Sequence, residues 1–219
     1  MFFVDYDNFK NYFLSKTDAY PDFAKVPDFL FKKINELRNW ERYNPRLIRT
    51  YMYSGEYTKE ITKKIKNKIA RSGDYDKNKI EKFLSKVRKE KSIQDCCFSR
   101  FIKLPFVELK LKPLQFSAKE LRLFQKGTDV QLAVDLVHHA YRNNFDVAIV
   151  CSGDVDLLES IKLVKNQGKK IVLVAHPGSL ASDMEKECDF FFNMAKVNDE
   201  ELKKLCFYIT DKNNKSGNI

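Results

Sequence analysis

The sequence predicts an α/β fold in which a parallel sheet is flanked by helices and carries a basic helical insertion. Short apolar runs without polar alternation recur along the chain, as expected of strands that are buried on both faces of a sheet. Segments with helical spacing of apolar residues lie between these runs, an order typical of parallel sheets. A lysine-rich stretch in the first half of the chain predicts the insertion.

Each expected element follows from a local pattern. The expected buried strands are residues 2–5, 46–54, 146–151, 171–175 and 189–192, which are rich in β-branched, aromatic or other apolar side chains. Residues 106–112 alternate apolar with charged side chains, which predicts a half-exposed strand near a sheet edge. Helical spacing predicts helices at 27–40, 129–143, 157–166 and 180–187, the third of them capped by Gly168.

The lysine-rich stretch, residues 56–91, contains thirteen basic and six acidic residues and has a net charge of +7. Isoleucines recur every fourth residue at 61, 65 and 69, and a second apolar series follows after a turn signal at 72–74. We interpret this region as two amphipathic helices that form a basic insertion, residues 56–95. The insertion interrupts a single domain of residues 1–210, and a polar tail follows at 211–219.

The whole chain has a net charge of +10, which favours a polyanionic partner. We expect RNA, with single-stranded DNA as the alternative, and no membrane, because no apolar run is long enough to span one. The alternative for the insertion is that its charges form ordinary solvated helix faces. The side chains expected to contact nucleic acid are Lys63, Lys64, Lys66, Lys68, Arg71 and Lys126.

Aromatic and cysteine residues add two further expectations. Tyr51, Tyr53 and Tyr57 are candidates for stacking on unpaired bases, although packing in the core is the favoured role. The five cysteines are odd in number and have no CxxC spacing, which indicates reduced thiols in a cytoplasmic protein.

Acidic residues follow the expected strands at their carboxyl ends. Asp5 ends the first strand, Asp154 and Asp156 follow the strand at 146–151, and Asp129 opens a helix after Gly127. In a parallel sheet, ligands bind at this edge. Clustered carboxylates repel one another, and a divalent cation relieves that repulsion. Oxygen ligands suit Mg²⁺ or Mn²⁺, either of which would polarise a phosphodiester bond.

Each acid also has a structural alternative. Asp154, Asp156 and Asp129 all suit helix N-termini, where aspartate caps free backbone N–H groups. Asp5 is not expected to be a cap, because no helix is predicted to start immediately after it. Asp135 lies in the middle of a helix and is either a supporting acid or a surface residue.

Three segments together resemble the NYN family, a branch of the PIN-like nucleases. These are FVDYDN at 3–8, KGTDVQLAVD at 126–135 and DVAIVCSGDVDL at 146–157, with GKKIV at 168–172 fitting the next strand. Tyr6 stands where the family has glycine, and Asp7 where glutamate is common. The resemblance covers residues 1–54 and 106–195, and the basic stretch is its least family-like part.

The resemblance implies a PIN-like, Rossmann-like fold and a metal-dependent ribonuclease that hydrolyses RNA phosphodiester bonds as an endonuclease. It implies that the metal ligands are Asp5, Asp129, Asp154 and Asp156, with Asn8, Ser152 and Asp135 in support.

Two rival functions remain open from the sequence. A haloacid-dehalogenase-like phosphatase would use Asp5 and Asp7 as paired aspartates, but Phe9 stands where that family has threonine or valine. A non-catalytic, basic RNA- or DNA-binding module would retain the acids only as structural residues. Stabilisation by Mn²⁺ would separate this module from a metal-dependent enzyme.

Overall fold

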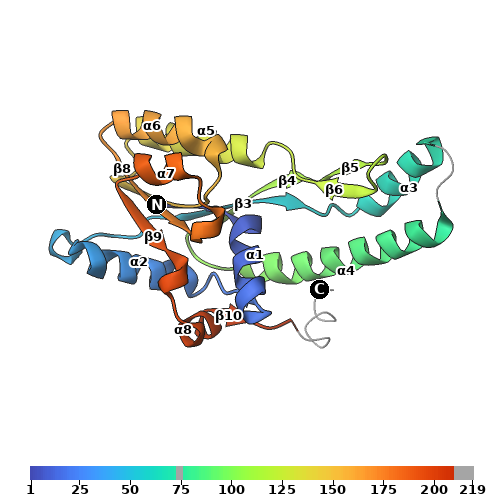
Figure 1. Ribbon diagram of the computed structural model, residues 1–219, viewed down its shortest axis with the longest axis horizontal. Helices are drawn as coiled ribbons and strands as arrows, with labels where there is room; N and C mark the ends of the chain where they lie inside the picture. The colour runs from blue at the N-terminus through green and yellow to red at the C-terminus, as the bar shows by residue number, and fades with distance from the viewer. Residues whose placement is uncertain (73–75, 210–219) are drawn as a thin grey trace.

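A parallel sheet with the strand order β4-β3-β1-β7-β8-β9 forms the centre of the computed structural model, which describes residues 1–72 and 76–209 (Figure 1). Every neighbouring pair in this sheet is parallel. The strands are β1 (Phe2–Asp5), β3 (Thr50–Glu56), β4 (Val107–Pro113), β7 (Val147–Cys151), β8 (Lys170–Ala175) and β9 (Phe190–Asn193). The predicted α/β fold is therefore confirmed, with β4 at one edge. The expected polar tail and the turn at residues 73–74 lie outside the described residues.

Helices cover both faces of the sheet, so the strands are buried without alternating polarity. One face packs against α1 (Tyr6–Thr17), α2 (Val26–Arg38), the end of α4 (Lys77–Phe101) and α8 (Asp199–Lys204). The other face packs against α5 (Thr128–Tyr141), α6 (Leu158–Asn166) and α7 (Ser182–Glu187). Within β1, Phe2 and Val4 belong to the first core and Phe3 to the second.

Short elements complete the described fold. β2 (Tyr20–Pro21) pairs antiparallel with β10 (Cys206–Phe207), and β5 (Gln115–Ser117) pairs antiparallel with β6 (Arg122–Phe124). Single 3₁₀ turns are η1 (Glu41–Tyr43), η2 (Val155–Leu157), η3 (Pro177–Ser179) and η4 (Met194–Lys196). The strand expected at 46–54 begins only at Thr50 and continues to Glu56.

Helix α1 was not expected from the sequence and changes the role of Asp5. It starts directly after β1, and the Asp5 side chain accepts the backbone N–H of Asn8 at 3.3 Å. Asp5 is thus the N-cap of α1, and the expectation that it is not a cap was wrong. Tyr6, Phe9 and Phe13 form the buried stripe of this helix, which is a helical spacing that the sequence does contain.

The basic stretch and the β5–β6 hairpin together form an arm, made of α3 (Ile61–Ser72), the N-terminal half of α4 and that hairpin (Figure 1). The arm has its own small core, composed of Ile61, Ile65, Ile69, Leu84, Val87 and Phe116. Helix α4 continues past residue 95 to Phe101, which is fully buried in the main core. One continuous helix therefore joins the arm to the body. No helix in residues 1–72 or 76–209 is long and apolar enough to cross a membrane.

Candidate active site

The carboxyl ends of β1 and β7 lie side by side and bring the first two predicted site residues together. Val4 pairs with Cys151 in the register of the two strands, so the next residues, Asp5 and Ser152, are neighbours. The Ser152 hydroxyl donates to Asp5 Oδ2 at 3.5 Å. Asn8, one turn into α1, donates its side-chain amide to the same oxygen at 2.8 Å. Two of the three predicted supporting residues, Asn8 and Ser152, thus contact Asp5 directly.

Burial and neighbouring charges make Asp5 an unusual carboxyl group. Its pKa is raised to about 6, chiefly by desolvation; the hydrogen bonds from Asn8 lower it, and the negative charges of Asp129 and Asp7 raise it. The side chains that cause the shift are Asn8, Asp129 and Asp7, none of which is basic. The carboxylate is therefore held in a place where negative charge is poorly compensated, which is a property of functional sites rather than of ordinary helix caps.

Asp129 joins the group from the other face of the sheet. It lies in the first turn of α5, whose N-cap is Gly127 with a φ of 84°, so Asp129 itself is not the cap. Burial raises the pKa of Asp129, and the charges of Asp154 and Asp156 raise it as well. Asp129 therefore lies close enough to Asp5, Asp154 and Asp156 to couple electrostatically with all three.

Asp154 has the capping role that the sequence left open, but only through one oxygen. Its Oδ1 accepts the backbone N–H of Asp156 at 3.0 Å and thereby caps η2. The backbone N–H of Asp154 in turn donates to the Ser152 hydroxyl at 3.2 Å. Asp156 is exposed. The loop after β7 thus presents two carboxylates at the sheet edge while Ser152 ties it to Asp5.

Gly153 is required here by close packing. Gly153 is not among the described residues with positive φ, so backbone freedom is not what requires glycine at this position. Instead, a Cβ atom at this position would lie 2.1 Å from the backbone carbonyl oxygen of Ser179. The loop after β7 and the loop after β8 touch through their backbones, and this contact fixes the position of Asp154 and Asp156.

We expect Gly153→Ala to destabilise the protein and to displace the acidic loop. Overpacking of this kind costs about 1–3 kcal/mol, since backbone rather than a flexible side chain has to move. The midpoint of urea unfolding measures the change. Gly127→Ala is the comparison, because a Cβ there meets nothing within 4 Å and strains only the backbone. A Gly153→Ala protein with unchanged stability would contradict the close contact.

Asp7 lies beside the acidic group and has a role that the sequence did not predict. Its Oδ2 accepts the Ser54 hydroxyl at 2.8 Å and the Gln125 amide at 2.6 Å, and its Oδ1 pairs with Lys10 at 2.6 Å. Gln125 also accepts the hydroxyl of Thr128, the first residue of α5. Asp7 thus links the starts of α1 and α5, the two helices that follow Asp5 and carry Asp129. Because both of its carboxylate oxygens already contact other side chains, Asp7 is not suited to act as one of the paired catalytic aspartates of a haloacid-dehalogenase-like phosphatase.

Asp135 lies apart from the acidic group. It accepts the Tyr53 hydroxyl at 3.0 Å and so fastens the middle of α5 to β3. Its charge is not among the causes that shift the pKa of Asp5 or Asp129. Tyr51 and Tyr53, which were candidates for base stacking, are buried in the core at 6% and 1% exposure.

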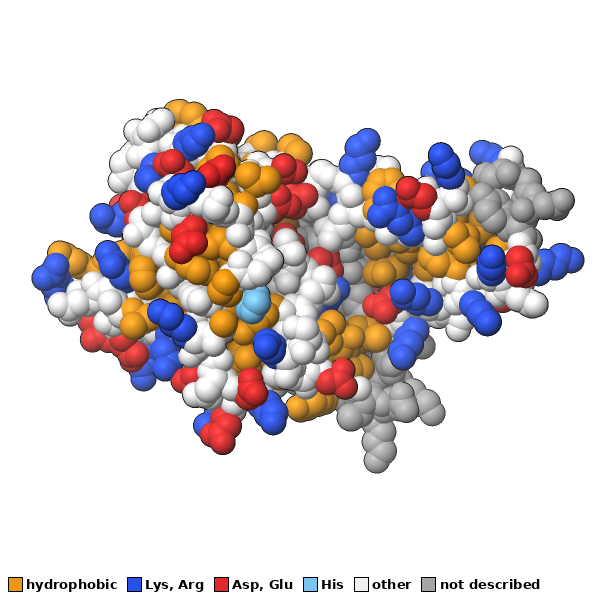
Figure 2. Space-filling model, in the orientation of Figure 1, with side chains coloured by type: hydrophobic (Ala, Val, Ile, Leu, Met, Phe, Trp, Pro, Cys, Tyr) orange, Lys and Arg blue, Asp and Glu red, His pale blue; other side chains and the backbone are white. Residues whose placement is uncertain are grey.

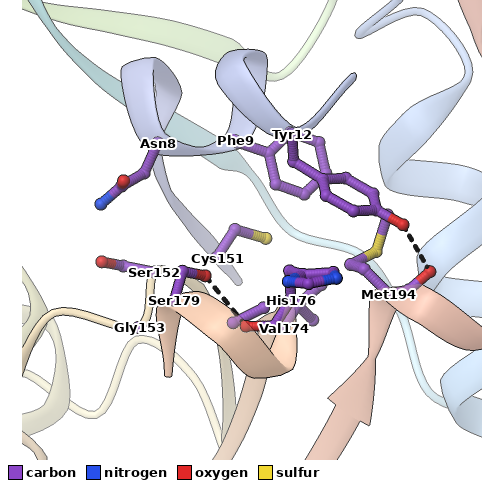
Figure 3. A pocket seen from close by; sticks show the side chains of 11 residues that line it. Asn8, Phe9, Tyr12, Cys151, Ser152, Gly153, Val174, His176, Ser179 and Met194 are labelled. Atoms are coloured by element: carbon purple, nitrogen blue, oxygen red, sulfur yellow. Dashed lines mark hydrogen bonds between the residues drawn. The ribbon is translucent and has the colours of Figure 1, made fainter. Parts of the chain in front are cut away.

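A small pocket lies beside Asp5, between α1 and the ends of β7 and β8 (Figure 3). Asn8, Ser152 and Gly153 line one side, and the Tyr12 and His176 rings, 5.3 Å apart, line the other. Its volume is about 20 Å³, which suits a single water molecule. This pocket is therefore too small to admit a nucleotide.

The cysteines do not supply a nucleophile. All five are free thiols, as predicted. Burial raises the pKa of Cys97 to about 12 and that of Cys151, beside the site, above its ordinary value. Such thiols stay protonated and unreactive.

The donor set fits a hard divalent cation. Asp5, Asp129 and Asp154 offer carboxylate oxygens, the ligand type that Mg²⁺ and Mn²⁺ prefer. Within the described part of the chain, no three His, Cys, Asp or Glu side chains converge closely enough to hold one ion together. Mg²⁺ is commonly held by one or two carboxylates, with water and substrate phosphate as the other ligands. Two carboxylates around Asp5 would satisfy that requirement.

Basic residues lie along the arm, which extends from the body of the molecule (Figure 2). Lys63, Lys64, Lys66 and Arg71 are exposed on α3, and Figure 2 shows Lys and Arg side chains along the arm. Lys68 differs, because its ammonium group donates to the Phe116 carbonyl at 3.1 Å. Lys126 is exposed in the turn before α5, three residues from Asp129.

The parallel sheet, the helices on both faces and the acids at its carboxyl edge define a PIN-like α/β domain. The chain belongs to the NYN domain family, which matches residues 1–195 and whose members are generally metal-dependent nucleases. The matched range includes the residues of the arm. A protein of unknown function from Vibrio parahaemolyticus has a similar structure, with a TM-score of 0.48, 15% sequence identity, and coverage of 88% of this chain and 90% of that one. No curated protein matches the chain.

Proposed function

We propose that the protein is a metal-dependent ribonuclease that hydrolyses RNA phosphodiester bonds internally at the carboxyl edge of the sheet. The observation that carries the proposal is the position of Asp5 beside other carboxylates. Its carboxyl group is desolvated, which raises its pKa, and the charges of Asp129 and Asp7 raise the pKa as well. A cation and the phosphate that follows it would supply the missing positive charge.

The residues at the sheet edge would have different roles, which depend on where each one lies. Asp5 and Asp129 would hold Mg²⁺ or Mn²⁺, and Asp154 and Asp156 would complete the charge around it from the loop after β7. When bound, such an ion polarises a phosphodiester and lowers the pKa of water. Asn8 and Ser152 orient Asp5 by donating to its Oδ2. Asp7 positions α1 and α5 through Ser54 and Gln125.

The arm would hold the RNA backbone. Lysine and arginine side chains neutralise phosphates and release counterions, which supplies most of the sequence-independent affinity for nucleic acid. Lys63, Lys64, Lys66 and Arg71 are exposed on one helix of the arm, whereas Lys126 stands next to the acidic group. Lys68 contributes less, because the Phe116 carbonyl already engages its ammonium group. Single-stranded DNA offers the same backbone charge and is the alternative ligand.

Cleavage of end-labelled single-stranded RNA tests the proposal. We expect cleavage with Mg²⁺ or Mn²⁺, none with EDTA, and none by Asp154→Asn, because the lost charge serves the metal and not the packing. The matched control is Asp146→Asn. Asp146 is 98% exposed at the opposite end of β7, and its contact is a 3.7 Å pairing with Lys169, so this variant should cleave like the wild type.

The outcomes separate the functions. Metal-dependent cleavage by the wild type and by Asp146→Asn, but not by Asp154→Asn, supports the nuclease. RNA binding without cleavage by any of them would instead favour the binding module. Equal cleavage by Asp154→Asn would place the chemistry elsewhere.

A further inference from the structure

A second cavity lies at the foot of the arm, between α1, α4 and the start of the arm. We refer to it as the foot pocket. Its lining includes Lys10 of α1, Tyr20 of β2, Tyr57 after β3, and Glu90 and Gln94 of α4. Its volume is about 90 Å³, roughly the space of three water molecules. That space admits the edge of one flat ring system, but not a whole nucleotide.

Gln94 builds the wall of this pocket. It is 9% exposed, accepts the backbone N–H of Tyr57 at 2.8 Å and donates to the Gly55 carbonyl at 2.7 Å. Both contacts fasten α4 to the end of β3. The backbone of Tyr57 is therefore fixed beside the pocket that this residue lines, and Tyr57 is half-exposed, in contrast to the buried Tyr51 and Tyr53.

Glu90 is the distinctive chemical group of the pocket. It is half-buried, and nothing in residues 1–72 or 76–209 makes a hydrogen bond or ion pair to it. Other acids of α4 are paired, Glu81 with Arg88 and Asp95 with Lys91. Burial and, among nearby charges, that of Glu90 raise the pKa of both Tyr20 and Tyr57 to about 12. A free carboxylate thus lies near two protonated phenols.

The foot pocket is close to the acidic group. Lys10 lines the pocket and pairs with Asp7, which is two residues from Asp5. Helix α1 rises about 1.5 Å per residue, so Lys10 lies roughly 8 Å beyond Asp5 along the helix axis. Successive phosphates of an extended strand are separated by a similar distance. A base in the foot pocket would therefore belong to a nucleotide one or two positions from the phosphate at Asp5.

We propose that the foot pocket binds an unpaired guanine of the RNA, with Glu90 accepting from the guanine edge and Tyr57 stacking on the ring. The inference rests on the proposed function for its substrate class. A carboxylate has two acceptor oxygens and no donor, and guanine alone presents two adjacent donors, N1–H and the 2-amino group, on its Watson–Crick edge. Adenine and cytosine place an acceptor beside their amino group, and uracil has acceptors on both sides of its N–H. Proteins read unpaired RNA bases through this edge and through aromatic stacking.

Binding of labelled hexanucleotides in EDTA tests this inference without cleavage. The probes are oligouridine RNAs in which one internal base is guanine, adenine, cytosine or uracil, and fluorescence anisotropy gives Kd. We expect the guanine probe to bind about tenfold more tightly to the wild type, the discrimination of one two-bond contact to a base edge. Glu90→Gln should remove this preference. Glu81→Gln, on the exposed part of the same helix, should keep it.

Each outcome has one meaning for the foot pocket. Equal affinity for the four probes, or a guanine preference that survives in Glu90→Gln, would overturn the inference. Guanine preference that depends on Glu90, in a protein that fails to cleave RNA with Mg²⁺ or Mn²⁺, would support the pocket and reject the nuclease. Cleavage by a protein that binds all four probes equally would support the nuclease and reject guanine binding in the foot pocket.

Discussion

Replacing Asp5 with asparagine is expected to abolish RNA cleavage and also to stabilise the metal-free protein. Activity should fall by more than about a hundredfold, the upper end of losses seen when only a ligand's supporting group is removed. Stability should rise because asparagine is as good an N-cap as aspartate and carries no charge beside Asp129 and Asp7. Asn8 can still bond to the new side chain, since its amide has both donors and an acceptor.

The direction of this stability change follows from the pKa shift of Asp5 on folding. The pKa of Asp5 is about 6 in the folded protein, whereas the ordinary value for an aspartate side chain is 3.8. A carboxyl whose pKa is raised by folding contributes stability at low pH, and that contribution is lost as the pH rises from about 4 through 6. A shift of this size corresponds to at most about 3 kcal/mol, and the partial exposure of Asp5 reduces it. We expect Asp5→Asn to melt about 5 °C higher than the wild type at pH 8.

Thermal unfolding in EDTA between pH 4 and pH 8 measures this difference. The two proteins should converge near pH 4, where Asp5 is protonated, and separate above pH 6. Mn²⁺ should then raise the Tm of the wild type by linkage and leave Asp5→Asn unchanged. Asp146→Asn serves as the control for loss of an unrelated aspartate. A variant less stable than the wild type at pH 8 would show that Asp5 is a structural cap and nothing more.

The sheet was predictable because its strands are marked by local composition. The runs at 2–5, 146–151 and 171–175 have no polar alternation, and only burial on both faces explains such runs. The strand order, in which β1 lies between β3 and β7, is not marked in this way and comes from the structure. Helix α1 escaped prediction because its apolar stripe is short and mixed with polar residues, and because Asp5 was read as the end of a strand and not also as the start of a helix.

The acidic group was predictable in part, for a geometric reason. Carboxyl ends of parallel strands share one edge, so Asp5 and Ser152 had to be neighbours once β1 and β7 were adjacent. Side-chain direction does not follow from that rule. Asp135 lies on the same helix as Asp129, yet it accepts a hydrogen bond from Tyr53 and not from a residue of the acidic group. Asp7 accepts a hydrogen bond from Gln125, which lies 118 positions away in the sequence. Glu90 likewise lines a pocket with residues of α1 only because α4 packs beside that helix in the fold.

Removing three lysines of α3 together is expected to weaken RNA binding strongly without changing the chemistry. Lys63→Ala, Lys64→Ala and Lys66→Ala eliminate exposed ammonium groups whose backbone lies outside the main core. Each phosphate contact to a single strand adds about 0.7 to the salt slope, so three contacts correspond to a loss of roughly 50-fold at 0.15 M salt. Kd measured against salt concentration should show both the weaker binding and a slope reduced by about 2.

A triple variant on the body separates this effect from loss of net charge alone. Lys32→Ala, Lys186→Ala and Lys203→Ala remove the same charge from α2, α7 and α8, where the lysines are also exposed. If the arm holds the RNA, this variant keeps nearly the wild-type affinity and salt slope, because screening at 0.15 M limits the reach of surface charges to about 8 Å. Equal weakening in both variants would mean that the +10 charge of the whole protein attracts RNA without a dedicated surface. Cleavage at saturating RNA should remain in either case, because the acidic group that we propose to hold the metal lies on the body and not on the arm.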